Sequence, residues 1–383
     1  MEVSNLKLIV LSNAKLLGDM VDKHLMLKRN TNESFIVPIK EVRFSNGEGK
    51  VSIGNTIRDK DVYIISDVGN YNCTYVMHGR TTYMSPDDHF QDIKRTISAM
   101  KGHSESINVV MPLLYSSRQH RRKGRESLDC AMALQELEAL GVSEIITFDA
   151  HDPNIQNAIP CMPFENFYPT YSILESLVND NKNQFNDIKN WLTISPDTGA
   201  MDRAKYVADV LGTDVGMFYK RRDFSTIVDG KNPIIAHEYM GKKINNKNAI
   251  VVDDMIASGD SIIEVSKELK DRGANKVFLV ATFALLTSGI ERFDKAYKEK
   301  LFDEIYTTNL TYMDESFERP WLHRVDCSEY LADIINTLNN KQSISPLLNR
   351  KENILTKQKK KQKLLFIFFS LRYLLFQLIE LLL

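Results

Sequence analysis

Short apolar runs, rich in β-branched residues, alternate with longer helical patterns from residue 6 to about residue 340. Runs that are apolar along their whole length are typical of parallel sheets, because helices cover both faces of such sheets. Parallel sheets bind ligands outside the carboxyl ends of their strands. We therefore expect an α/β protein whose functional residues directly follow the apolar runs. The clearest predicted strands are KLIVLS (7–12), DVYIIS (61–66), INVVMPLLY (107–115), EIITFD (144–149), WLTIS (191–195), DVGMFY (214–219), AIVVDD (249–254) and KVFLVATF (276–283).

Two segments between these strands carry apolar residues at helical spacing. They are 126–140 and 261–272, and Gly273 is expected to end the second helix. The residues expected to face the core are Leu128, Met132, Leu137 and Leu140 in the first segment and Ile262, Val265 and Leu269 in the second.

The length of 383 residues is enough for two domains. Several prolines interrupt any long helix near residues 155–170, which indicates a domain boundary there. We expect domains at 1–165 and 166–340, followed by a Lys-rich linker and a hydrophobic tail over 341–383.

The composition excludes some classes of protein. There are 49 basic and 50 acidic residues, a balance that argues against a nucleic-acid binder, which would show a basic face or a high isoelectric point. The four cysteines are far apart and form no C-x-x-C pair. We therefore expect neither a disulfide framework nor a structural zinc site, and the cytoplasm is the expected compartment. The apolar run Leu6–Leu11 is too short for a signal peptide.

The most informative segment is VVDDMIASGDS (251–261). A buried strand carrying two carboxylates, Asp253 and Asp254, is followed by a short loop and the start of a helix. Gly259 lets backbone amides approach an anion closely, and the helix N-terminus adds a positive dipole end. The carboxylates can accept hydrogen bonds from vicinal hydroxyls, so a phosphorylated sugar would satisfy both halves. The alternative is a solvated acidic strand end followed by a serine-capped helix.

This segment resembles the PRPP loop of the type I phosphoribosyltransferase fold. Further motifs over residues 5–340 are similar, in the same order, to those of ribose-phosphate pyrophosphokinases, also called PRPP synthetases. The resemblance implies two tandem phosphoribosyltransferase-like domains, each a mostly parallel sheet flanked by helices. Position 257 is Ala where many bacterial members have Asp, so no general base is available there. The residues implied to bind ribose 5-phosphate are Asp253, Asp254, Ala257, Ser258, Gly259, Asp260 and Ser261.

Two motifs resemble the ATP-binding segments of the family. In RFSNGEGKVSI (43–53) the resemblance implies contacts to adenine and ribose from Phe44, Asn46 and Glu48. Taken alone, this string is typical of an Asn-Gly turn between two strands. In YSSRQHRRKGRES (115–127) it implies ATP contacts from Arg118 and Gln119, although His120 stands where the family usually has Asp. Five basic residues in 118–125 would otherwise suggest an RNA-binding patch, but the acidic balance elsewhere favours a polyphosphate.

Two further motifs imply a Mg²⁺ site. His151 in TFDAHD (147–152) and Asp197 in SPDTGAMDRA (195–204) stand at the positions of the family's metal ligands. The alternatives are a structural histidine, since Mg²⁺ prefers oxygen, and an Asp197 that only caps the helix 200–211.

The string FYKRRD (218–223) resembles the start of the family's catalytic loop, in which Lys220 and Arg222 would close over the triphosphate. A charged surface loop is the alternative.

The resemblance implies Mg²⁺-dependent transfer of the diphosphoryl group of ATP to the C1 hydroxyl of ribose 5-phosphate, giving PRPP and AMP. This reaction requires in-line positioning and cations on the oxygens that gain charge. The family forms homo-oligomers, commonly hexamers, whose interfaces create active and regulatory sites. Three rivals stay open: a catalytically silent regulatory subunit, a nucleotide-forming phosphoribosyltransferase, and a membrane-tethered binding protein.

Residues 364–383 are about 30 Å long as a helix, enough to span a bilayer. Fifteen of these twenty residues are Leu, Ile or Phe, which favours insertion, whereas Arg372 and Glu380 oppose it. A marginal membrane anchor, an interfacial or partner-binding helix, and a non-native extension of the reading frame stay open, and we do not favour the anchor.

Overall fold

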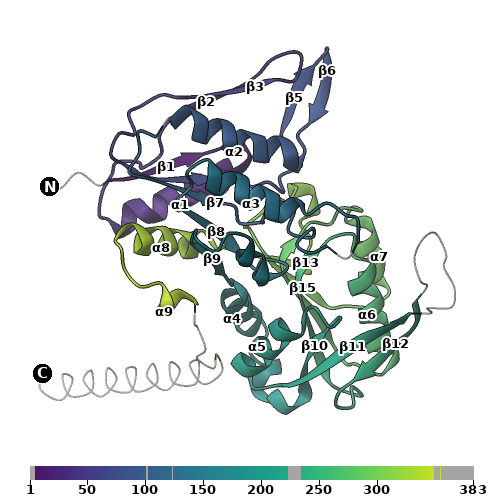
Figure 1. The fold of residues 1–383 in the computed structure, drawn as a ribbon. Coiled ribbons are helices and arrows are strands. Elements are labelled where there is room, and N and C mark those ends of the chain that lie inside the picture. Colours follow the sequence, from purple (N-terminus) through teal and green to yellow (C-terminus); the bar gives the residue numbers. More distant parts are fainter. Residues whose placement is uncertain (1–4, 101, 123, 223–233, 349–353, 355–383) are drawn as a thin grey trace, which may run out of the picture.

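Two sheets form the centres of two domains in the computed structural model, which describes residues 5–100, 102–122, 124–222, 234–348 and 354 (Figure 1). Neighbouring strands in the first sheet are all parallel. Across this sheet the order is β1 (Leu6–Val10), β4 (Asp61–Ile65), β7 (Ser106–Val110), β8 (Glu144–Phe148) and β9 (Phe164–Phe167).

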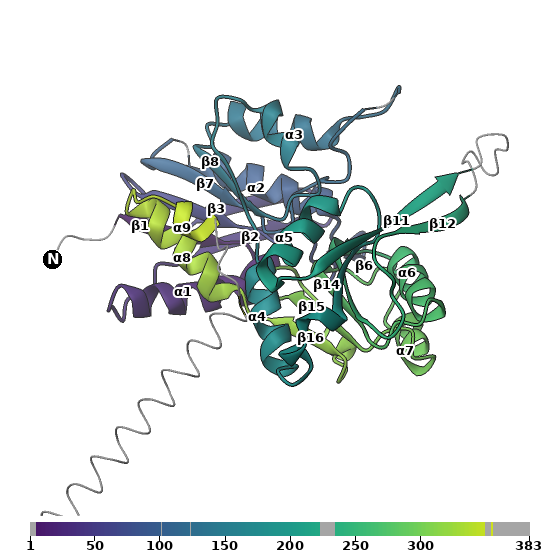
Figure 2. The ribbon, with the colours of Figure 1, turned by 90° about the horizontal axis from the view of Figure 1, so that it is seen from below.

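The second sheet is parallel except for one antiparallel pair, β11 with β12. Its order is β12 (Ile234–Met240), β11 (Asp214–Arg222), β10 (Trp191–Ser195), β13 (Asn248–Ile256), β14 (Val277–Ala284), β15 (Glu304–Thr308) and β16 (Leu322–Val325). In Figure 2, β11 and β12 project away from the body of the molecule. The α/β class with two sheets flanked by helices is confirmed.

Helices cover both faces of each sheet, which explains why the central strands are apolar along their whole length. On the first sheet, α2 (Pro86–Met100) and α3 (Asp129–Ala139) share a core with one face, and α1 (Lys15–Lys28) packs on the other. On the second sheet, α6 (Asp260–Asp271) and α7 (Glu291–Lys298) share one core, and α4 (Thr170–Asp180) and α5 (Met201–Leu211) share the opposite one.

The helix α8 (Ser328–Asn339) follows the second sheet in the chain but packs against α1 on the first sheet. Its fully buried Leu331, Ile334 and Ile335 belong to the same apolar cluster as Leu25 of α1. The one-turn helix α9 (Ser345–Leu348) follows, and the hydroxyl of Tyr330 donates to the carbonyl oxygen of Leu347 at 2.8 Å. The expected boundary between 165 and 166 falls inside β9, and α8, which belongs to the expected domain 166–340, packs on the first sheet side of the molecule through α1.

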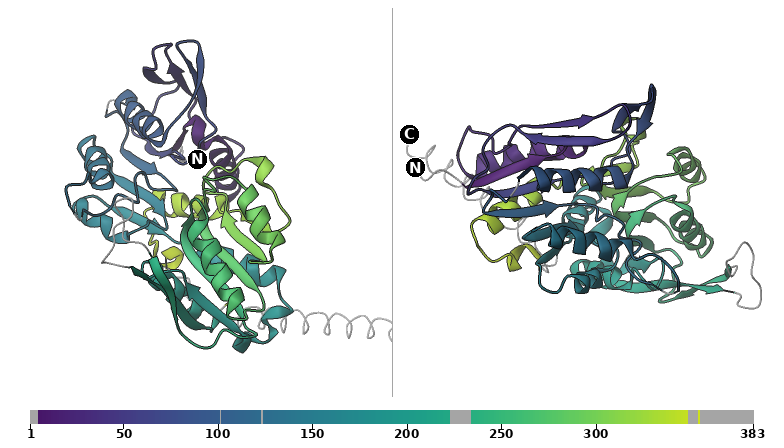
Figure 3. Two further views of the ribbon diagram at one scale, coloured as in Figure 1. Left: turned by 90° about the vertical axis from the view of Figure 1, so that its right-hand side faces the viewer. Right: turned by 45° about the horizontal axis from the view of Figure 1, so that its top comes forward.

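Two antiparallel hairpins extend the first domain. They are β2 (Ile39–Arg43) with β3 (Gly49–Ile53), and β5 (Thr74–Met77) with β6 (Arg80–Tyr83). In both views of Figure 3, the dark blue β5–β6 hairpin lies at the top of the molecule, and the teal and green β11 and β12 lie toward the bottom. The expected turn between two strands at 43–53 is confirmed, since Gly47 has a φ of 92° between β2 and β3.

Local patterns predicted most central strands to within one or two residues, with two informative differences. The run 107–115 ends as a strand at Val110, because Pro112 lacks the amide that would continue the ladder. Met132 of α3 and Leu140, which directly follows this helix, are 55% and 42% exposed, so the predicted core face was partly wrong. The face of α6 was predicted correctly, as Ile262, Val265 and Leu269 are all buried.

Across the described ranges, no helix is both long enough and apolar enough to cross a membrane. The hydrophobic tail 364–383 and the Lys-rich stretch before it lie outside those ranges.

We expect Leu25→Ala to lower the free energy of unfolding by about 2–5 kcal/mol, because it leaves a cavity in the cluster between α1 and α8. The matched control is Leu27→Ala on the same helix. Its side chain is 78% exposed, and the expected change is within about 0.5 kcal/mol. Urea unfolding followed by circular dichroism measures both. A Leu25→Ala protein with the midpoint of the parent would contradict the buried α1–α8 interface.

Candidate active site

One cavity of about 930 Å³ brings together most of the predicted site residues. Its walls come from the carboxyl ends of β8, β10 and β13 and from the segment after β7, so it lies where the carboxyl edges of the two sheets meet. Phe44, Asn46, Glu48, Gln119 and Asp260 are not among the residues that line it. The predicted site residues that do line it are Arg118, His151, Asp197, Asp253, Asp254, Ala257, Ser258, Gly259 and Ser261.

The predicted sugar-phosphate loop is shorter than its motif suggests. The strand β13 continues to Ile256, so Asp253 and Asp254 lie within it, and α6 begins at Asp260. Gly259 has a φ of +88°, and a Cβ at this position would lie 2.2 Å from the ring of Phe293. Glycine is therefore required here both by the backbone conformation and by the contact with α7.

The two adjacent aspartates have opposite electrostatic environments. Burial, and then the charge of Asp254, raise the pKa of Asp253 well above its usual value. Burial alone would also raise the pKa of Asp254, but the hydrogen bond from His151 and the charge of Arg203 lower it overall. The imidazole Nδ1 of His151 lies 2.7 Å from Asp254 Oδ2. Asp254 is thereby held as the ionised member of the pair, and His151 is fixed in orientation at the cavity wall.

A buried ion pair that the sequence analysis did not single out lies beneath these groups. Arg203 Nε donates to Asp149 Oδ1 at 2.7 Å, and the Thr282 hydroxyl donates to Asp149 Oδ2 at 2.7 Å. Arg203 also donates to the carbonyl oxygen of Ala150 at 3.0 Å, next to His151. Burial raises the pKa of Asp149, and the charge of Arg203 opposes that shift. Three elements, the end of β8, α5 and β14, thus meet at one carboxylate.

A signal for this pair was present in the motifs. Arg203 is the arginine of the quoted SPDTGAMDRA string, and Asp149 is the third residue of TFDAHD. Neither string alone indicates that the two side chains bind each other, because they lie 54 residues apart in the chain. The aromatic residues Tyr168, Tyr206 and Tyr219 also line the cavity without having been predicted.

Asp197 both binds backbone amides near α5 and lines the cavity. Its Oδ1 accepts from the amides of Gly199 at 2.8 Å and Ala200 at 3.2 Å, just ahead of α5. The same residue lines the cavity. The hydrogen bonds of Asp197 to the turn before α5 therefore do not exclude a metal-binding role for its carboxylate, which stays a prediction.

Arg118, His120 and Arg121 line the side of the cavity after β7. The ring of His120, which replaces the family's Asp, lies 5.3 Å from the ring of His151, and its Nε2 lies 3.4 Å from Asp152 Oδ2. Burial lowers the pKa of His120, so Arg118 and Arg121 give this side of the cavity the positive charge that a polyphosphate requires.

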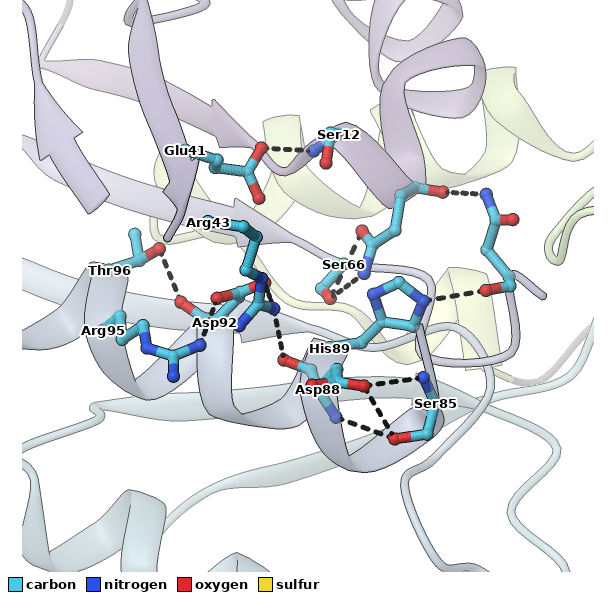
Figure 4. A network of polar contacts seen from close by, with 12 residues as sticks. Ser12, Glu41, Arg43, Ser66, Ser85, Asp88, His89, Asp92, Arg95 and Thr96 are labelled. Atoms are coloured by element: carbon cyan, nitrogen blue, oxygen red, sulfur yellow. Dashed lines mark hydrogen bonds and ion pairs between the residues drawn. The ribbon is translucent and has the colours of Figure 1, made fainter. Parts of the chain in front are cut away.

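The predicted adenine-binding residues lie in the β2–β3 turn, away from the cavity of their own chain. Phe44 is 48% exposed, and Asn46 Nδ2 donates to Glu48 Oε2 at 3.0 Å. Figure 4 shows how the hairpin is held. Arg43 and Arg95 both pair with Asp92 of α2, and the amide of Ser12 donates to Glu41 at 2.8 Å. These contacts fix the two strands of the hairpin, and with them the position of the turn.

Lys220 and Arg222 lie in β11, where their backbones pair with those of His237 and Ile234 of β12. Their side chains, and the part of the predicted catalytic loop that follows Arg222, lie outside what the structure describes.

Within the described part of the chain, no three His, Cys, Asp or Glu side chains are grouped closely enough to hold a metal ion by themselves. Mg²⁺ is commonly bound through one or two carboxylates together with water and substrate phosphates. His151 and Asp197 at the cavity wall fit that kind of shared site.

Comparisons with known proteins agree on one family. A family model described as the N-terminal domain of ribose phosphate pyrophosphokinase matches residues 6–141, and a model of the phosphoribosyl synthetase-associated domain matches residues 225–349. The ribose-phosphate pyrophosphokinase of Vibrio cholerae is 28% identical over 312 residues, which is 80% of this chain and 90% of that protein. That of Buchnera aphidicola is 27% identical over 310 residues, which is 80% of this chain and 89% of that protein.

A solved structure shows the same fold. The crystal structure of phosphoribosylpyrophosphate synthetase from Mycobacterium smegmatis matches with a TM-score of 0.72 at 20% identity, and the match covers 88% of this chain and 99% of that one.

We expect Arg203→Met to lower the free energy of unfolding by about 3–5 kcal/mol, because it leaves Asp149 buried without its cation. Adding Asp149→Asn should recover most of that loss, since the carboxamide is neutral and can still accept from Thr282. Urea midpoints of the parent, single and double variants give the comparison. Additive losses in the double variant would show that the two side chains do not act as a pair.

Proposed function

Because this chain belongs to the ribose-phosphate pyrophosphokinase family, we propose that it transfers the diphosphoryl group of ATP to the C1 hydroxyl of ribose 5-phosphate, giving PRPP and AMP. The observation that carries the proposal is the single cavity in which the loop Ala257–Gly259, His151, Asp197 and the cationic Arg118 meet.

In this proposal ribose 5-phosphate binds at the end of β13. Asp253 and Asp254 accept hydrogen bonds from the vicinal hydroxyls of the sugar. The amides that follow, from Ala257 to Ser261, bind the 5′-phosphate at the N-terminus of α6. The lowered pKa of Asp254 keeps it a charged acceptor at neutral pH.

Mg²⁺ is the proposed cofactor, held by His151 and Asp197 together with phosphate oxygens of ATP. When bound, it would neutralise charge on the transferred group. The hydrogen bond between His151 and Asp254 directs the second ring nitrogen, Nε2, as the ligand atom, because Nδ1 is already engaged.

The residues proposed to bind ATP do not all line the same cavity within one chain. Arg118 lines the cavity, and Gln119 is its neighbour in the chain. Phe44, Asn46 and Glu48 do not line it, so we assign them to the cavity of a second copy of this chain. The proposal thus includes a homo-oligomer, for which the family's hexamer is the reference.

The chemical step depends on orientation and positive charge. The C1 oxygen of ribose 5-phosphate attacks the β-phosphorus of ATP, the bond from that phosphorus to the bridging α,β-oxygen breaks, and AMP leaves with the electron pair. Lys220 and Arg222 close over the triphosphate and stabilise the charge that develops on its oxygens. Ala257 offers no base, so the C1 proton passes to solvent or to a phosphate oxygen.

The rival functions differ in what they require. A silent regulatory subunit would have lost the loop cations or the metal ligands, whereas this chain retains Lys220, Arg222, His151 and Asp197. A nucleotide-forming phosphoribosyltransferase would not need the ATP motifs. A cytoplasmic location and the role of residues 364–383 stay predictions.

Purified full-length protein with ATP, ribose 5-phosphate and Mg²⁺ should form AMP and PRPP in equal amounts. The two products are separated by anion-exchange chromatography, and PRPP is confirmed by coupling to a purified phosphoribosyltransferase. Release of ADP or inorganic phosphate without PRPP would refute the proposed reaction. No turnover, together with ribose 5-phosphate binding, would favour the regulatory subunit.

Lys220→Ala should lower kcat by about 10²–10³-fold while ribose 5-phosphate still binds, because a preorganised charge on the transferred group is lost. Lys242→Ala is the control, since its ammonium pairs with Asp214 on the exposed surface. Steady-state rates and calorimetric titration with ribose 5-phosphate measure the two effects. Parent-like turnover in Lys220→Ala would remove this residue from the mechanism.

Asp197→Asn should raise the Mg²⁺ concentration at half-maximal rate by about tenfold or more. The carboxamide oxygen can still accept from Gly199 and Ala200, so the start of α5 is preserved while the charge is lost. Asp209→Asn, an exposed carboxylate on the same helix, should leave the Mg²⁺ dependence unchanged. Equal Mg²⁺ curves for Asp197→Asn and the parent would exclude Asp197 as a ligand.

A further inference from the structure

The sugar-phosphate loop is held from behind by one stretch of chain, Leu285–Phe293. The amides of Leu285 and Leu286 donate to the carbonyl oxygen of Ile256 at 2.9 and 3.2 Å, and the amide of Thr287 donates to that of Ala257 at 3.0 Å. The ring of Phe293 fills the space beside Gly259, where a Cβ would lie 2.2 Å from it. The carbonyl side of the loop is thus bound to the protein.

The backbone amides of the loop differ from its carbonyl groups in this respect. Among the described residues, no acceptor is bonded to the backbone amides of Ala257, Ser258 or Gly259. Ala257, Ser258 and Gly259 line the cavity, so their backbone amides are available there to a bound anion.

Arg292 completes this support with two separate nitrogens. One terminal nitrogen donates to the carbonyl oxygen of Ser258 at 2.8 Å, and the other lies 2.7 Å from Asp260 Oδ1. The second carboxylate oxygen of Asp260 accepts from the Ser258 hydroxyl at 2.8 Å. The guanidinium presents a separate nitrogen to each partner, whereas a lysine presents a single nitrogen on a flexible stem and cannot reproduce both contacts in this geometry.

A charged pair, Asp260 with Arg292, lies next to the proposed 5′-phosphate site. Asp260 places a carboxylate in the first turn of α6, next to the proposed 5′-phosphate site. Its repulsion of a bound phosphate is reduced because Arg292 neutralises it. Hydrogen bonds from Ser258 and then Arg292 lower the pKa of Asp260, so the pair is charged at neutral pH.

We propose that Arg292 is a positioning residue for ribose 5-phosphate: through Ser258 and Asp260 it holds the loop in the conformation that binds the 5′-phosphate. Neither Arg292 nor Asp260 lines the cavity, so Arg292 acts through the loop and not on the substrate. The proposal rests on the proposed function, and it adds a residue that none of the sequence motifs indicated. Without the clamp, the substrate would have to order the loop as it binds, which weakens binding without changing the chemical step.

The test measures KM for each substrate and kcat in Arg292→Ala. We expect KM for ribose 5-phosphate to rise about tenfold, with KM for ATP and kcat changed by less than about twofold, because only uniform binding of the sugar phosphate is lost. Arg292→Lys should recover only part of the loss, since it cannot bind both partners. Unchanged KM for ribose 5-phosphate in Arg292→Ala would overturn the proposal, and so would a fall in kcat at unchanged KM.

A matched control is a second arginine that binds α7. Arg319, which precedes β16, pairs with Asp294 of α7 through its Nε at 2.9 and 3.2 Å and through a terminal nitrogen at 2.9 Å, and does not contact the loop. Arg319→Ala should leave both KM values unchanged. If it raised KM for ribose 5-phosphate as much as Arg292→Ala does, the effect would belong to α7 as a whole and the proposed clamp would be wrong.

A double-mutant cycle tests whether the two partners act as one unit. Asp260→Asn and Arg292→Ala combined should raise KM no more than Arg292→Ala alone, and additive losses would contradict the clamp. Calorimetric titration with ribose 5-phosphate separates this proposal from the proposed function. No binding to the parent would refute the function itself, whereas equal binding to the parent and Arg292→Ala would refute only the clamp.

Discussion

The buried contact of Arg203 with Asp149 is the interaction on which the geometry of the cavity depends. It joins the end of β8 in the first domain to α5 in the second, and Thr282 of β14 completes it. His151 follows Asp149 by two residues, and Arg203 also binds the carbonyl oxygen of Ala150 between them. The position of His151 against Asp254 is therefore set by a contact between domains. A cavity with walls from both sheets keeps its shape only if a contact between the domains holds the two sheets in place.

Each domain contributes a different kind of group to the cavity. The first supplies nitrogen-bearing side chains after its strands, Arg118, His120 and His151, and the second supplies carboxylates and a glycine loop after β10 and β13. Both sets stand at carboxyl ends of parallel strands, the positions at which such sheets bind ligands. Among the residues that line the cavity, Arg118 and Arg121 come from the first domain, and Asp253 and Asp254, the proposed acceptors for the sugar, come from β13 of the second. The reaction proposed here needs the two together.

Features that depend on neighbouring residues could be predicted from the sequence, whereas contacts between residues far apart in the chain could not. Neighbouring residues determine the strand β13, the loop at Gly259 and the buried face of α6, and local patterns predicted these features. The Asp149–Arg203 pair spans 54 residues, and the bond from Arg292 to Ser258 spans 34. No local pattern encodes such pairs. The placement of Phe44 outside its own cavity depends on tertiary structure in the same way, and the roles of Lys220 and Arg222 stay predictions.

The packing of α8 on α1 has a consequence for how the chain matures on the ribosome. Domains commonly fold in order as they are synthesised, the N-terminal one first. Here α1 packs on the first sheet, but the part of its apolar surface that contacts α8 can be covered only after residues 328–339 have been made, when the second sheet is already complete in the chain. The first domain therefore keeps part of its core open to water until α8 has been synthesised.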